Sequence, residues 1–146
     1  MIKQPILVVD NAPYTRTIAP ALVTLGYRVV SARNAIEGLR EYETIRPAWV
    51  IASAQMSDVP DMMDAIRLRD QTIPFLVTSA GDLKTAMTTF ADQADEFLDL
   101  PVDPLILKAV LRRMEKTVRL QRRIRSLAEN FESRAKDSVR SIIETE

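Results

Sequence analysis

The sequence contains no cysteine and no histidine among its 146 residues. Without cysteine the chain can form no disulfide, no thiolate nucleophile and no thiolate metal site. Without histidine it lacks the commonest general base, the commonest metal ligand and the side chain that becomes phosphohistidine. Most catalytic repertoires are therefore excluded, and we expect that the chain is not an enzyme.

Long apolar runs are also missing. No stretch of about 18 apolar residues could span a bilayer, and the start of the chain, Met1 to Pro5, leads into a strand pattern without a basic and apolar leader. An apolar content of 47% with 27% charged residues is typical of a globular domain. We expect a cytoplasmic protein with no membrane segment.

The net charge of zero hides an uneven distribution. Residues 1–104 hold 9 Lys and Arg against 14 Asp and Glu, whereas residues 105–146 hold 11 against 6. Within 112–125 the only acidic residue is Glu115. The basic residues there are Arg112, Arg113, Lys116, Arg119, Arg122, Arg123 and Arg125.

Short runs of β-branched and aliphatic residues alternate with segments of helical period, the pattern of a doubly wound parallel sheet. The predicted strands are 6–9, 27–30, 49–52, 75–77 and 97–98. The predicted helices between them are 17–25, 35–45, 62–68 and 83–90. Gly26 is expected to end the first helix, Asn34 and Asp82 to act as N-caps, and Pro47 and Pro74 to stand just before strands.

A last helix is predicted from Pro104, since neither Gly nor Pro follows through Glu146. Its apolar residues recur every three or four positions, interrupted at Gln121: Leu107, Leu111, Met114, Val118, Ile124, Leu127, Phe131, Ala135, Val139 and Ile142. About 40 residues at 1.5 Å each reach about 60 Å, too far for one small domain to cover. We predict a domain over 1–122 and a helical or coiled-coil extension over 123–146, continuous with the domain's last helix. The extension would pair with a second copy, fray, or lead into a further domain.

Four residues are predicted at the C-terminal ends of strands: Asp10, Asn11, Ser53 and Leu100. In an open α/β sheet these ends converge on the ligand crevice. The crevice would hold one carboxylate, one amide, one hydroxyl and one aliphatic side chain. The crevice lies where such folds bind ligands, but it holds few of the charged or reactive groups that an active site needs.

Residues 4–122 resemble the receiver domain of response regulators in two-component signalling. Five segments match in order: the first strand with Asp10, the start of the second helix, the third strand with Met56 three residues after Ser53, the fourth strand with Ser79, and the fifth strand with Phe97. They are 6–11, 34–39, 46–51, 73–80 and 97–103. The resemblance implies a flavodoxin-like fold, a five-stranded parallel sheet in the order 2-1-3-4-5.

The departures from the family pattern fall on the residues that perform its chemistry. Ser53 stands where the family has its phosphoaccepting aspartate, Leu100 where it has a lysine, and Asn11 where it has the second acidic residue of a magnesium-binding pair. Ser79 and Phe97 match the hydroxyl and aromatic residues that couple phosphorylation to surface change. They can equally be a satisfied strand-end hydroxyl and a packed aromatic.

The resemblance with these departures implies a degenerate receiver, or pseudo-receiver, that signals without phosphorylation. Transfer from phosphohistidine needs a carboxylate nucleophile, a divalent ion and a cation on the phosphoryl oxygens. We expect no cofactor, because a single carboxylate, Asp10, gives at most a weak Mg²⁺ site. Asp10 can instead cap a loop or accept hydrogen bonds from Asn11 and Ser53.

The expected partners are proteins. We predict contact with a partner or a fused output domain, through the face of the fourth helix, fifth strand and fifth helix, and homodimerisation through the last helix. The helical ending 141–146 suggests the N-terminal part of a longer protein. An alternative is an adaptor that binds a small ligand in the strand-end crevice or nucleic acid on the basic helix 112–125. We do not expect nucleic-acid binding, because the basic run has no aromatic residue to stack on a base.

Three acidic residues after the third strand, Asp58, Asp61 and Asp64, suggest either a metal site or the start of a helix. Their spacing of three places them along one side of a helical turn, where carboxylates favour the positive helix end. We interpret them as a helix start. Asp58 is the one loop carboxylate that could replace the phosphoacceptor, but it lies five residues beyond the predicted strand.

Overall fold

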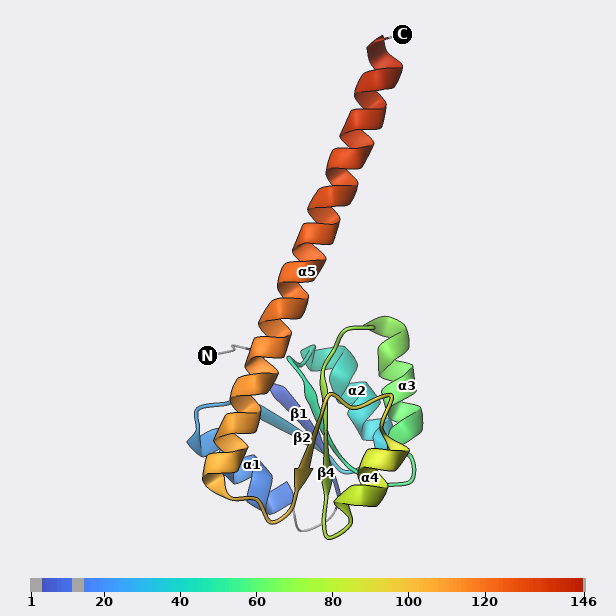
Figure 1. Cartoon of the computed structure of the whole chain (residues 1–146). Coiled ribbons are helices and arrows are strands. Elements are labelled where there is room, and N and C mark those ends of the chain that lie inside the picture. The colour runs from blue at the N-terminus through green and yellow to red at the C-terminus, as the bar shows by residue number, and fades with distance from the viewer. Residues whose placement is uncertain (1–3, 12–14, 146) are drawn as a thin grey trace.

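The computed structural model describes the backbone of residues 4–11 and 15–145. Five parallel strands form one sheet in the order β2-β1-β3-β4-β5 (Figure 1). The strands are β1 (Ile6–Val9), β2 (Val29–Ala32), β3 (Val50–Ser53), β4 (Phe75–Ser79) and β5 (Glu96–Asp99). The helices are α1 (Thr15–Thr24), α2 (Ala35–Ile45), α3 (Val59–Arg69), α4 (Leu83–Thr89) and α5 (Pro104–Thr145). The predicted fold and strand order are confirmed.

Alternation along each strand divides the core into two layers, because successive side chains point to opposite faces of a sheet. Ile6 and Val8 pack with α1 and the first half of α5, whereas Leu7 and Val9 pack with α2, α3 and α4. Both faces are covered, which is why the central strands β1, β3 and β4 are buried along their whole length and mostly apolar.

Two predicted strands are displaced along the chain. The prediction of a strand at 27–30 is wrong by two residues, since β2 begins at Val29 and ends at Ala32. Gly26, with φ of 96°, turns the chain, and the Tyr27 ring packs on Trp49 before pairing with β1 begins. The third strand begins and ends one residue later than predicted, so Ser53 is the last residue of β3. The helix 35–45 and the strand 6–9 are confirmed, and α1, α3, α4, β4 and β5 differ from the prediction only at their ends.

The caps of α2 and α4 are confirmed. Asn34 Oδ1 accepts the Glu37 N–H at 2.8 Å, and Asp82 Oδ1 accepts the Thr85 N–H at 3.1 Å. Hydrogen bonds from the side chain and the backbone N–H of Thr85 lower the pKa of the Asp82 carboxyl. A Cβ at Gly38 of α2 would meet Met62 Sδ of α3 at 2.8 Å and Val9 Cγ2 of β1 at 3.0 Å, so glycine permits the close packing of α2 on both.

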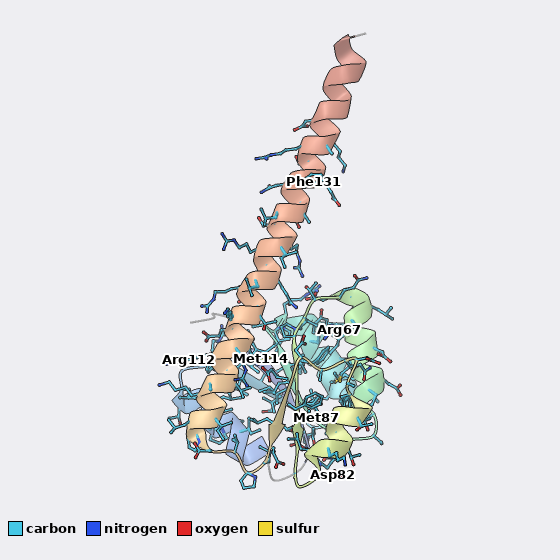
Figure 2. All side chains as sticks on the ribbon, viewed as in Figure 1. Arg67, Asp82, Met87, Arg112, Met114 and Phe131 are labelled. Atoms are coloured by element: carbon cyan, nitrogen blue, oxygen red, sulfur yellow. The ribbon has the colours of Figure 1, made fainter. Side chains whose placement is uncertain are left out.

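The helix α5 has two unlike halves. Its first half packs on the sheet through buried Leu107, Leu111, Met114 and Val118. The second half rises away from the body (Figure 1), and Figure 2 shows Met114 over the sheet and Phe131 beyond it. Here the large apolar side chains are exposed, by 65% at Ile124 and 75% at Phe131. The predicted helix is confirmed over Pro104–Thr145, while Glu146 and the side chains of Val139 and Ile142 lie outside the described residues.

Candidate functional site: the C-terminal edge of the sheet

The C-terminal ends of the strands bring together the residues expected there. Asp10 follows β1, Ser53 ends β3, Ser79 ends β4, and Leu100 follows β5. Val9 pairs with Ala52 and Ser53 with Thr78, so Asp10 and Ser53 occupy neighbouring positions along one edge. All four of these side chains are buried, whereas Asn11 is exposed.

Ser53 has both of its hydrogen-bonding functions in use. Its hydroxyl donates to Gln55 Oε1 at 2.8 Å and accepts the Gln55 N–H at 3.2 Å. The side chain is only 1% exposed. An amide oxygen is too weak a base to take the hydroxyl proton, so this arrangement holds the proton on Ser53 instead of activating the oxygen as a nucleophile.

Leu100 is part of the apolar layer beneath α5. It is 8% exposed and packs in the same cluster as Leu98 and Leu107, while its N–H donates to the Ser79 carbonyl at 2.8 Å. The position where the family has a lysine therefore contributes apolar contacts and no charge. The Leu100–Pro101 peptide bond is cis.

The two switch-like residues have local structural contacts. The Ser79 hydroxyl accepts the Asp82 N–H at 3.3 Å and so supports the turn into α4. Phe97 is partly buried against the opposite apolar layer, the one under α2, α3 and α4. Both contacts agree with the structural reading of these residues, while a coupling role stays a prediction.

The acidic residues after β3 point in different directions. Asp58 precedes α3 and its Oδ2 accepts the Ala35 N–H at 3.3 Å, whereas Asp64 Oδ1 accepts from Gln93 Nε2 at 2.6 Å. Asp61 lies in the first turn of α3, as a helix start requires. Within the described part of the chain, no group of three or more His, Cys, Asp or Glu could hold a metal ion.

Sequence reasoning missed Gln55 as the partner of Ser53. A serine hydroxyl often accepts the N–H two residues later in a turn, so the Ser-x-Gln order directly after a strand is the available signal. It also missed Thr78, which is 3% exposed beside Ser53 and whose hydroxyl lies 3.5 Å from the Ala52 carbonyl. Together these neutral groups line the edge where the family concentrates charge.

Known proteins resemble the chain in both sequence and fold. A response regulatory protein of Vibrio parahaemolyticus is 30% identical over 115 residues, which cover 77% of this chain and 48% of that protein. The acid tolerance regulatory protein ActR of Rhizobium meliloti is 30% identical over 115 residues, covering 76% of this chain and 59% of ActR. The chain thus spans about half the length of these curated relatives. No protein-family model matches it.

Among solved structures, NtrX of Brucella abortus has a TM-score of 0.77 and 25% identity over 86% of this chain and 29% of NtrX. A receiver-domain protein of Clostridium thermocellum has a TM-score of 0.68 and 22% identity over 82% of this chain and 97% of that one, a likeness of fold alone. With the strand order, the strand-end positions and the sequence relatives, these matches show that the chain belongs to the response-regulator receiver domain family of two-component signalling.

Proposed function

We propose that this receiver domain signals without aspartyl phosphorylation. The observation that carries the proposal is the state of Ser53: a buried hydroxyl, hydrogen-bonded twice to Gln55, at the end of β3. A serine cannot form an acyl phosphate, and the Ser53 hydroxyl donates its proton to an amide oxygen, which is too weak a base to activate it. Leu100, packed in the apolar layer, supplies no cation for phosphoryl oxygens.

Magnesium binding at this edge is expected to be weak. Mg²⁺ takes hard oxygen ligands and usually one or two carboxylates. The strand ends offer one buried carboxylate, that of Asp10, with the exposed amide of Asn11 next to it. The donor set therefore fits the ion poorly, and we propose a domain that needs no cofactor and performs no catalysis.

Signalling would then pass through surface contacts. The face formed by α4, β5 and α5 is the proposed contact surface, where Arg113 Nε donates to Glu96 Oε1 at 2.7 Å and joins α5 to β5. Met87 on α4 and Ile106 on α5 are large apolar side chains exposed by 49% and 57%. Because the curated relatives extend well beyond the matched region, we propose that this surface meets a partner protein or a fused output domain.

The exposed half of α5 is suited to pair with a second copy of the chain. Leu120, Ile124, Leu127 and Phe131 recur at steps of four, three and four, the spacing of a coiled-coil seam. At 3.6 residues per turn this stripe lies about 140° around the helix from Leu107, Leu111, Met114 and Val118. One face of α5 can thus stay on its own body while the opposite face meets a second helix.

Phosphorylation is tested by incubating the full chain with acetyl phosphate and Mg²⁺ and measuring the intact mass. We expect no stoichiometric phosphoryl adduct in the wild type or in Asp58→Ala. A stoichiometric adduct on the wild type would contradict the proposal, and its loss in Asp58→Ala would locate it on the loop carboxylate.

Dimerisation is tested by light scattering of the full chain and of the double variant Ile124→Glu/Leu127→Glu. We expect a dimer that the double variant converts to a monomer, because four carboxylates would face one another across the seam. The control is Leu105→Glu, another exposed leucine of α5, at its first turn. A wild-type monomer at high concentration would refute the pairing.

A second candidate function is nucleic-acid binding by α5. The exposed residues Arg112, Lys116, Arg119 and Arg123 recur at steps of four, three and four, and so form one basic stripe along the helix. Phosphate contacts would make such binding fall steeply with salt. A salt-dependent titration with duplex DNA and with RNA tests it, and the absence of binding at low salt leaves only the protein-contact function.

A further inference from the structure

A groove lies at the opposite edge of the sheet, where the strands begin and α5 leaves the body. Its volume is about 590 Å³, within the range of small-molecule sites. Its walls come from the end of α2, the α3–β4 connection and the middle of α5. These elements contribute Arg46, Arg69, Arg122 and Arg125, with the neutral donors Thr72 and Gln121 between them.

The groove has an excess of positive charge. Among the residues that line it, four arginines face a single carboxylate, that of Asp70. Asp70 already accepts the N–H and hydroxyl of Thr72 and an Arg125 N–H at 3.3 Å. Arg69 pairs with Glu43. No ion pair between described residues involves Arg46 or Arg122, and the side-chain partner of Arg46 is the neutral Tyr42 hydroxyl, so neither guanidinium is neutralised by a carboxylate.

One of the arginines is oriented by hydrogen bonds, and another has an unusual backbone conformation. Arg125 donates to Thr72 Oγ1 at 2.6 Å as well as to Asp70, which orients its guanidinium at the wall. Arg46 caps α2 with φ of 49°, a left-handed conformation that costs a non-glycine residue about 1 kcal/mol or more. Glycine is the ordinary residue for this conformation, so an arginine at this position lowers the stability of the fold.

We propose that this groove binds a small anion with two or more phosphate groups, such as a nucleoside polyphosphate. Guanidinium groups match phosphate oxygens with paired N–H donors, and several arginines around one cavity suit a ligand with several phosphates. The volume suits a small molecule better than a protein segment. A ligand held between Arg46 of the body and Arg122 of α5 would also fasten the helix where it leaves the domain.

The test is isothermal titration calorimetry of the full chain with inorganic tripolyphosphate, ATP and adenosine. Tripolyphosphate and ATP are expected to bind and adenosine is not. Arg122→Gln should weaken binding about tenfold, the effect of one lost charge-assisted contact. Arg123→Gln is the matched control: the same charge change one residue along α5, outside the groove lining, with an expected loss of less than about threefold.

Arg46→Gly separates binding from folding, because glycine relieves the left-handed backbone while it removes the cation. We expect weaker binding with an unchanged or raised melting temperature. Three results would overturn the proposal: no binding of tripolyphosphate at low salt, equal losses in Arg122→Gln and Arg123→Gln, or tighter binding of an acidic peptide than of tripolyphosphate. None of these three results depends on whether Ser53 accepts a phosphoryl group. The proposal of anion binding in the groove and the proposal of signalling without phosphorylation can therefore be refuted independently.

Discussion

The two edges of the sheet differ in how they use polar side chains. At the C-terminal edge, the Ser53 hydroxyl pairs with Gln55, the Ser79 hydroxyl accepts the Asp82 N–H, and Leu100 packs into the core. At the N-terminal edge, arginines from three elements surround an open groove. In Figure 2, Asp82 marks the first edge and α5 leaves the body from the other.

In open α/β sheets ligands usually bind at the C-terminal strand ends, whereas the groove proposed to bind an anion lies at the N-terminal ends. Replacing a few side chains removes charge from the C-terminal edge without disturbing the strand order. Helix α5, which crosses the sheet, places cations at the opposite edge.

Among the helices that the structure describes, none has the length and apolar character to cross a membrane.

The largest effect is expected from Leu100→Lys, which tests whether the C-terminal edge is truly part of the core. The lysine would lose apolar contacts and bring an amine into the layer beneath α5. We expect the free energy of unfolding to fall by about 2–3 kcal/mol in urea titrations. Leu105→Lys, at a leucine that is 78% exposed, should change it by less than about 0.5 kcal/mol. Equal effects would show that position 100 opens to solvent.

A smaller effect is expected from Ser53→Asp, which restores a carboxylate beside Asp10. Two buried carboxylates without the family's lysine repel one another, so unfolding should become easier by about 1–2 kcal/mol relative to the uncharged control Ser53→Asn. Millimolar Mg²⁺ should recover part of the loss in Ser53→Asp only, since binding to the folded state stabilises it. Equal stabilisation of the wild type by Mg²⁺ would show that Asp10 and Asn11 suffice for an ion site.

Much of the fold could be predicted because its signals are local. The apolar runs, the caps at Asn34 and Asp82 and the helix 35–45 are each encoded within a few residues. The boundary of β2 could not, because it depends on how Tyr27 packs against Trp49. At the site, the positions of Asp10 and Ser53 followed from the strand pattern, but the choice of Gln55 as partner depends on side-chain geometry. The groove joins Arg46 to Arg125, far apart in sequence, and only the crossing of α5 brings them together.

The smallest effect concerns pH and probes the N-terminal edge through Tyr42, which lines the groove. Burial raises the pKa of the Tyr42 hydroxyl and the Asp70 charge raises it further, whereas Arg46 lowers it. A pKa above the unfolded value means that the folded state holds the proton more tightly. Its contribution to stability is therefore complete below about pH 10 and is lost as the pH rises through the folded pKa.

Melting temperatures measured from about pH 9 to about pH 11 should consequently fall more steeply in the wild type than in Tyr42→Phe. Tyr27, whose pKa is also raised by burial and by its hydrogen bond to Glu115, is common to both proteins, so the difference isolates Tyr42. Arg46→Gly should be steeper than the wild type, because the cation that opposes the shift is gone. A slope unchanged by Arg46→Gly would mean that this guanidinium points away from the groove, and the N-terminal edge would then have one cation fewer for an anionic ligand.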